Sequence, residues 1–98
     1  MYAEGHGVSQ DYKEAVKWFR KAAEQGEALA QYDLGFMYGK GHGVPRDYIL
    51  AHMWFTLAAG NGIKTAIRLR EAAEALLTPS QIEEARHLAK DWTPKKSR

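Results

Sequence analysis

The amino-acid sequence predicts an all-α fold, a solenoid of antiparallel helix pairs made from five helices. Two observations lead to this prediction: a segment of the chain repeats after 36 positions, and apolar residues recur at intervals of three and four along each copy. In addition, no segment shows the period-two alternation of a half-buried strand. With 98 residues, 45% of them hydrophobic and 27% charged, the chain has the composition of one small globular domain.

The repeat becomes visible when residues 1–26 are aligned with residues 37–62, because 14 of the 26 pairs are identical. The identical pairs are Met1/Met37, Tyr2/Tyr38, Gly5/Gly41, His6/His42, Gly7/Gly43, Val8/Val44, Asp11/Asp47, Tyr12/Tyr48, Ala15/Ala51, Trp18/Trp54, Phe19/Phe55, Ala22/Ala58, Ala23/Ala59 and Gly26/Gly62. A period between about 20 and 50 residues is typical of solenoids, in which neighbouring repeats stack on one another.

The first helix is predicted over about 11–25 and its copy over about 47–60. Their shared apolar residues recur at three- and four-residue spacing, which places them on one helix face. Asp11 followed by Glu14 has the pattern of a capping box. Gly26, like its copy 36 residues later, stands where the helix needs a left-handed residue to end.

A second helix is predicted between these two, over about 27–39, from the stripe Ala30, Leu34 and Tyr38 at intervals of four. Gly35 lies beside this stripe, where a missing side chain lets a neighbouring helix approach closely. Because the connections are short, the two helices of a pair are expected to be antiparallel neighbours. The loop that ends this helix contains Gly39, Gly41, Gly43 and Pro45.

The last third of the chain keeps the helix-pair plan without the glycine-rich loop. One helix is predicted over 63–77, and Thr78 followed by Pro79 marks the start of a final helix over about 79–92. That helix has one apolar and one charged side, as expected of a terminal helix whose outer face meets water. Residues 93–98 are expected to form a flexible tail.

These residues carry a resemblance to a known family. The stretch from Ala30 to Gly62, with its Leu-Gly pair, its Gly-His-Gly-Val loop and the Asp-Tyr, Trp and Ala-Ala positions that follow, resembles one complete Sel-one-like repeat, a relative of the tetratricopeptide repeat. Residues 1–26 resemble the second half of a preceding repeat and 63–92 a diverged capping helix pair, so the solenoid spans 1–92. The resemblance implies a right-handed superhelix that acts as a non-catalytic scaffold or adaptor for protein partners, without a cofactor.

The resemblance also implies where a partner binds, because the first helix of each pair lines the concave groove in tetratricopeptide-like folds. The implied groove residues are Leu29, Tyr32 and Phe36, with Lys40 at the edge. A helical wheel independently places the first three opposite the apolar stripe of the same helix. One period later, the same wall holds Thr65, Arg68 and Ala72, and Arg68 is a candidate to pair with an acidic partner residue. The alternative interpretation is that this face packs against a neighbouring repeat.

Self-association is the alternative function. The repeat pattern begins partway through a repeat, which leaves one side of the first helix uncovered, including parts of Val16, Phe19 and Ala23. Such an apolar patch favours a homodimer.

Composition excludes several other classes. The chain has no cysteine, which excludes disulfides, thiolate zinc sites and a cysteine nucleophile. A net charge of +2 is too small to predict nucleic-acid binding, and no apolar stretch approaches the roughly 18 residues of a membrane span. We therefore expect a soluble protein of the bacterial cytoplasm or periplasm, without nucleic-acid or membrane partners. Because the repeat pattern begins inside a repeat, the absence of a leader in this sequence does not distinguish the two compartments.

The remaining patterns are better explained by structure than by chemistry. No two carboxylates are paired as a hydrolase requires, so the chain is not expected to be an enzyme. The histidines lack the local spacing of a metal site, and the Gly-His-Gly segments lack the remaining residues of a phosphate loop. The Trp-Phe pairs lie on the repeating helix face, which predicts core packing rather than base stacking. These residues are His6, His42, His52 and His87; the segments 5–7 and 41–43; and Trp18, Phe19, Trp54 and Phe55.

Overall fold

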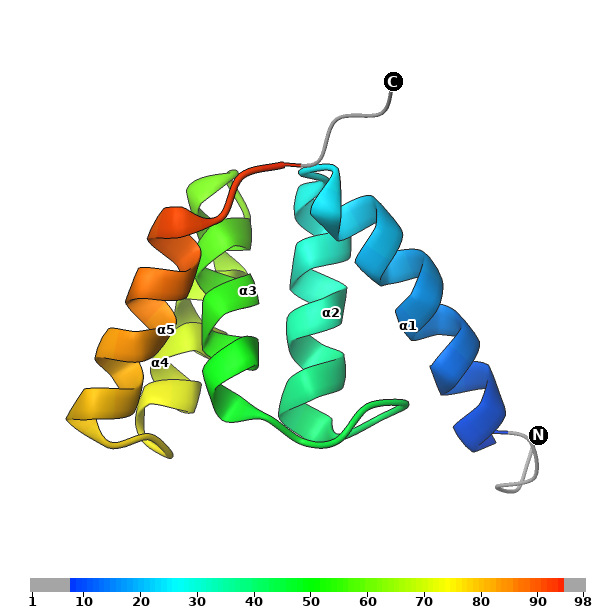
Figure 1. The fold of residues 1–98 in the computed structure, drawn as a ribbon, viewed down its shortest axis with the longest axis horizontal. Coiled ribbons are helices and arrows are strands. Elements are labelled where there is room, and N and C mark those ends of the chain that lie inside the picture. Colours follow the sequence, from blue (N-terminus) through cyan, green and yellow to red (C-terminus); the bar gives the residue numbers. More distant parts are fainter. Residues whose placement is uncertain (1–7, 95–98) are drawn as a thin grey trace.

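The computed structural model describes residues 8–94, with side chains from residue 11 onward, and this part of the chain is all-α (Figure 1). The helices are α1 (Val8–Glu24), α2 (Ala28–Lys40), α3 (Tyr48–Gly60), α4 (Thr65–Glu74) and α5 (Pro79–Asp91). No strand occurs among the described residues. The predicted all-α helical repeat, with its five helices, is confirmed.

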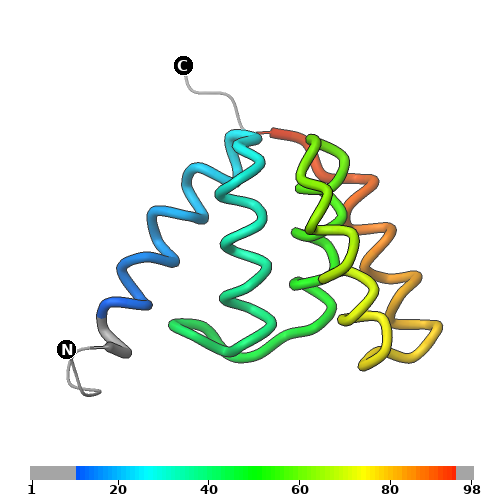
Figure 2. The backbone as a smooth tube through the Cα atoms, turned by 180° about the vertical axis from the view of Figure 1, so that it is seen from behind, coloured from blue at the N-terminus to red at the C-terminus, as the bar shows by residue number. Residues whose placement is uncertain are grey.

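The helices form a row in which α3 has the most neighbours. It packs against α2, α4 and α5, whereas α1 packs chiefly against α2. Figures 1 and 2 show α1 at one edge of the row, leaning away from α2, and α4 and α5 at the other edge. The last two helices are therefore not a close pair like α2 and α3; each packs chiefly against α3 instead. None of the described helices is long and apolar enough to cross a membrane.

The helix ends follow the local signals of the sequence. The side chain of Asp47 accepts a hydrogen bond from the backbone N–H of Leu50, at 3.0 Å, and so caps α3. Thr78 and Gln81 form a complete capping box at the start of α5, with Pro79 in the first helical position. The predicted left-handed residue after α1 is also present, because Gly26 has a φ of 96°.

The predicted bounds of three helices are wrong. The helix predicted over 63–77 is shorter, Thr65–Glu74, and the bounds of α1 and α2 also differ. The helix α1 begins at Val8, so Asp11 lies inside its first turn and is not the cap that its copy Asp47 is. The sequence difference behind this is Pro45, whose counterpart in the first copy is Ser9. Because a proline disfavours helical conformation in the residue before it, α3 cannot extend upstream as α1 does. The helix α2 extends through Lys40, so Gly39 is helical and the left-handed residue is Gly41.

The close approach of α2 and α3 depends on Gly35. A Cβ atom on this residue would lie 2.7 Å from Cε1 of Phe55, well inside van der Waals contact. The aromatic ring of Phe55, which is 4% exposed, thus rests directly on the backbone of α2. The predicted role of Gly35 as a site of close approach is confirmed.

The buried side-chain amide of Gln31 joins the ends of three helices. The Gln31 side chain, which is fully buried, donates through Nε2 to the carbonyl oxygen of Ala23 at 3.2 Å. Its Oε1 accepts a hydrogen bond from Nδ2 of Asn61 at 2.9 Å. One side chain therefore links the end of α1, the first turn of α2 and the end of α3, with both polar atoms satisfied.

The two copies of the tryptophan have opposite environments. Trp54 is buried in the main core, where its ring meets that of Trp92 edge to face, with 5.9 Å between the centroids. Trp18 is 65% exposed, and Nζ of Lys21 lies over its ring, 5.5 Å from the centroid. The prediction of core packing is therefore wrong for Trp18.

The neighbours on each helix explain this difference. The side of α3 that carries Trp54 also carries Leu50, Met53 and Leu57. These residues join the core that includes Ala89 and Trp92. The corresponding positions around Trp18 hold Glu14, Lys17 and Lys21. Charged residues do not bury an apolar face, so this side of α1 remains in water.

The side of α1 that was predicted to be uncovered, and so to support a homodimer, is largely buried. Val16 and Ala23 are buried, 3% and 0% exposed, and belong to the core between α1 and α2. Phe19 is half-buried. Trp18 lies on the opposite side of the helix because positions 16 and 18 differ by about 200° on a helical wheel.

The Gly35–Phe55 contact predicts opposite effects for two glycine-to-alanine substitutions in α2. Alanine gains roughly 0.5–1 kcal/mol over glycine inside a helix, but at position 35 its methyl group would overlap Phe55. Overpacking of this kind costs roughly 1–3 kcal/mol. We expect Gly35→Ala to lower the free energy of unfolding by about 1–2 kcal/mol in urea denaturation. Gly39→Ala is the matched control, since its nearest atom would be Ala51 Cβ at 3.8 Å, and we expect it to raise stability. Equal effects at the two positions would contradict the close approach.

The two tryptophan environments predict unequal costs of truncation. Trp54→Ala should lower the free energy of unfolding by about 3–5 kcal/mol, because it empties a packed core position. Trp18→Ala should change it by less than about 0.5 kcal/mol, as surface substitutions usually do. Thermal or urea unfolding of both variants measures the contrast, and similar losses would show that α1 is covered in solution.

Candidate functional site

An apolar groove lies across α2, α3 and α4. It encloses about 260 Å³. The helix α2 forms one wall and α4 the other, with α3 between them. Lys40 is the only charged residue among those that line it. The lining residues are Phe36, Gly39 and Lys40 from α2, Tyr48, Ala51 and Phe55 from α3, Leu69, Ala72 and Ala73 from α4, and Leu76 from the turn after α4.

Three aromatic rings support the α2 side of this groove. The ring of Phe36 meets those of Tyr32 and Phe55 edge to face, with centroid distances of 5.5 and 6.1 Å. Tyr32 and Phe55 are also edge to face, at 6.1 Å. Edge-to-face pairs at these distances are favourable beyond the area they bury. Tyr32 and Phe36 are therefore half-buried against α3 and still present part of their surface to the groove side of α2.

The residues proposed from the sequence lie at different places relative to the groove. Phe36 and Lys40 line it, and Tyr32 supports Phe36 from behind. Leu29, which precedes Tyr32 by about one helical turn, is 67% exposed and is not among the residues that line the groove. Arg68 is exposed on α4 and does not line the hollow. The role of these five residues in binding stays a prediction.

Several groove residues were missed by sequence reasoning. Ala72 was placed on this wall, but Leu69 and Leu76, three residues before and four after it, were not. Their spacing is that of one helix face, a signal present in the sequence. The sequence identifies Tyr48 as a member of the repeat and does not predict that it lines the groove. Its place in the groove depends on how α3 passes between α2 and α4.

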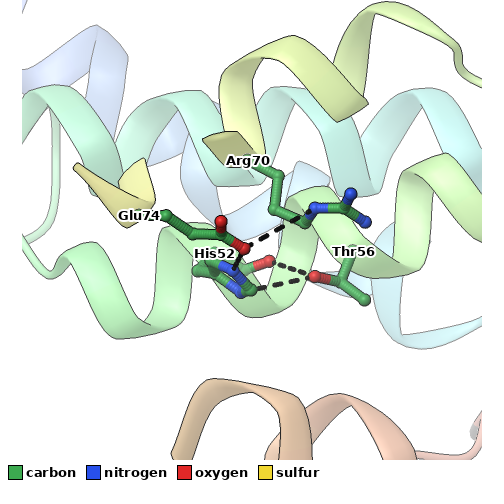
Figure 3. Close-up of polar contacts among 4 residues, drawn as sticks. All are labelled: His52, Thr56, Arg70 and Glu74. Atoms are coloured by element: carbon green, nitrogen blue, oxygen red, sulfur yellow. Dashed lines mark hydrogen bonds and ion pairs between the residues drawn. The ribbon is translucent and has the colours of Figure 1, made fainter. Parts of the chain in front are cut away.

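A polar cluster joins α3 to the α4 wall of the groove (Figure 3). Nε2 of His52 and Oε2 of Glu74 are 2.8 Å apart, and the histidine is 1% exposed. The hydroxyl of Thr56 donates to the backbone carbonyl of His52 at 2.8 Å and lies 3.4 Å from Nδ1. Nε of Arg70 is 4.0 Å from Oε2 of Glu74 and makes no hydrogen bond with the described residues. With Nε2–H donating to Glu74, the ring is held in one orientation.

The electrostatics of this cluster favour the ionised carboxylate. The hydrogen bond from His52 is the main reason that the pKa of Glu74 is below its ordinary value. Burial opposes this shift, while the nearby charges of His52, Arg70 and Arg86 add to it. In the first copy of the repeat, the position of His52 is occupied by Val16, which is buried against α2. The sequence showed the Arg70–Glu74 spacing but gave no sign that Glu74 reaches the buried histidine.

The histidines occupy separate environments. The ring of His42 lies against that of Tyr12, with 4.3 Å between centroids. His87 is next to Glu83, with 3.6 Å between Nε2 and Oε2, on the exposed side of α5. His6 lies outside the described residues. Within residues 11–94, no three histidine, aspartate or glutamate side chains are grouped as metal ligands would be.

The lowered pKa of Glu74 predicts how stability depends on pH. A carboxyl group whose pKa is lower in the folded chain stabilises the fold above its unfolded pKa, near 4.5. This contribution is lost as the pH falls through the folded pKa. We expect Glu74→Gln to be more destabilising at about pH 6 than at about pH 3.5, measured by urea unfolding. Glu71→Gln, at an exposed position of the same helix, is the control and should show less pH dependence. A penalty for Glu74→Gln that does not change with pH would argue against the ionised pair.

Comparison with known protein families agrees with the repeat seen in the sequence and the structure. The family model of the Sel1 repeat matches residues 1–27 and again residues 28–63, which together are more than half of the chain. The second match contains α2 and α3, the helix pair joined at Gly35 and Phe55. No curated protein matches the chain. On these matches, the chain belongs to the Sel1 repeat family.

Proposed function

We propose that this protein is a non-catalytic interaction module whose groove across α2, α3 and α4 holds a segment of a protein partner. Sel1 repeats generally mediate interactions between proteins and are typically non-catalytic. The observation that carries the proposal is the groove itself. Nine of its ten lining residues are uncharged, and the tenth, Lys40, is exposed.

The size of the groove favours a chain segment over a small molecule. Pockets that enclose small-molecule ligands usually measure roughly 300–1,000 Å³ and are largely closed. About 260 Å³ between two helices suits one or two apolar side chains projecting from a bound segment. Aromatic and aliphatic anchors in such hollows contribute much of the free energy of peptide binding.

The exposed leucine at one end of the groove supports the same function. Leu76 lines the hollow and is 59% exposed, so a partner would bury apolar surface that is now in contact with water. Leu29 adds a second exposed leucine on α2, the other wall. We propose that Leu29, Tyr32, Phe36 and Lys40 contact the partner along α2, and that Arg68 contacts it from α4.

Self-association through α1 is the weaker candidate. With Val16 and Ala23 buried, Trp18 is the largest apolar side chain exposed on this helix. One aromatic side chain buries roughly 150–250 Å², whereas a stable dimer needs roughly 800 Å² from each partner. The exposed apolar area of α1 is therefore too small to be the main site.

The proposal is tested with peptides selected from a displayed random library on the wild-type protein. We expect Leu76→Asp to weaken the binding of the selected peptides by at least about tenfold, because it places a charge in an apolar hollow. Leu88→Asp, at a 39% exposed leucine on α5 outside the groove, is the matched control and should leave affinity unchanged. Fluorescence anisotropy of labelled peptides measures both, and circular dichroism checks that both variants fold. Peptides that bind Leu76→Asp as tightly as wild type would overturn the proposal.

A further inference from the structure

A second hollow lies on the other side of α2, next to α1 and the loop that follows α2. It encloses about 340 Å³ and shares Phe36 and Lys40 with the groove. Its walls include two further aromatic residues, Tyr12 and Phe19 from α1, and one carboxylate, Asp33. A segment crossing α2 at Phe36 would therefore reach both hollows.

Among the described residues, Asp33 has no charged partner. It is half-buried and forms no hydrogen bond or ion pair with any described residue. Burial raises the pKa of the Asp33 carboxyl above its ordinary value, since the ionised form loses part of its hydration. At neutral pH, a cation placed next to this carboxylate would compensate for the lost hydration.

The aromatic walls suit the same kind of group. A guanidinium or ammonium group over the face of a tyrosine or phenylalanine ring is attracted by the ring electrons, and the long aliphatic part of the side chain packs on the ring. Tyr12 is itself held in place by the ring of His42, 4.3 Å away. We propose that this hollow receives an arginine or lysine side chain of the partner segment, whose neighbouring apolar side chain occupies the groove. This inference rests on the proposed function and specifies the chemistry of the partner.

Lys40 does not cancel the attraction of Asp33. The two residues are seven positions apart on α2, which corresponds to about 10 Å along the helix axis. At physiological ionic strength the screening length is about 8 Å, so a cation seated beside Asp33 feels that carboxylate much more strongly than the exposed Lys40. Lys40 instead marks the part of the hollow that a basic side chain would avoid.

The test compares two small probes that differ by one charge. N-acetyl-L-arginine amide carries the guanidinium group, and N-acetyl-L-citrulline amide is its neutral counterpart of nearly the same shape. In two-dimensional ¹H–¹⁵N NMR titrations of the 98-residue chain, we expect the arginine probe to shift the amide signals of Asp33, Met37 and His42. We expect its apparent affinity to be about three- to tenfold higher than that of the citrulline probe.

Two conservative variants make the test specific. Asp33→Asn should abolish the preference for arginine without unfolding the protein, because an amide is nearly isosteric and avoids the cost of a partly buried charge. Glu27→Gln removes an exposed carboxylate at the start of the same helix and should leave the preference unchanged. The inference fails if neither probe shifts these signals, if both bind equally, or if Asp33→Asn keeps the preference. If it fails while the selected peptides still depend on Leu76, the groove stands and only the basic subsite is lost.

Discussion

The contact between the Phe55 ring and the backbone of α2 at Gly35 is the constraint on which the rest of the structure depends. Without a side chain at position 35, α2 and α3 approach closely enough for the ring to lie against the helix backbone. Phe55 then forms the floor of the groove and supports Phe36 and Tyr32 on its α2 wall. A wider spacing of these two helices would separate the three rings and remove the floor from the hollow. The same contact therefore stabilises the helix pair and shapes the proposed binding surface.

Polar contacts hold the other parts of the fold to this pair. His52 and Glu74 attach α4 to α3, and Gln31 and Asn61 attach the helix ends to one another. Each contact has one fully buried partner, His52 or Gln31, so it adds little net stability but penalises arrangements in which that partner is left unpaired. Because α4 packs chiefly against α3, the His52–Glu74 pair is important for the position of α4. That position determines whether Leu69 and Leu76 face Phe36 across the groove.

The two copies of the repeat share half of their residues but have different surroundings. Trp54 is covered by α5 and Trp92, while Trp18 is in water among charged neighbours. Phe55 is fully packed between helices, while its copy Phe19 is half-buried and lines the hollow that holds Asp33. A solenoid repeat buries its faces only where another repeat lies against it. The same motif thus forms core in the middle of the row and an accessible aromatic surface at its edge.

The sequence by itself determined the local structure of this protein. The 36-residue repeat, the three- and four-residue spacing of apolar residues, the Thr78–Pro79 start signal and the glycine after α1 gave the five helices and the family. The position of Gly35 beside the apolar stripe of its helix also predicts a close approach of a neighbouring helix, because glycine has no side chain there. Helical spacing, capping and turn signals depend on neighbours within a few turns of the chain, which is why the sequence pattern contains them.

Tertiary structure alone decided which faces are covered. The exposure of Trp18, the burial of Val16, the pairing of His52 with Glu74 and the hollow around Asp33 all arise from residues on different helices. The groove shows the same limit: Phe36 and Lys40 could be proposed from α2, but Arg68 does not line it and Tyr48 does. Helical periodicity gives the direction of each side chain about its own axis. The distance and tilt between helices, which place one face against another, come only from the packing of the whole row.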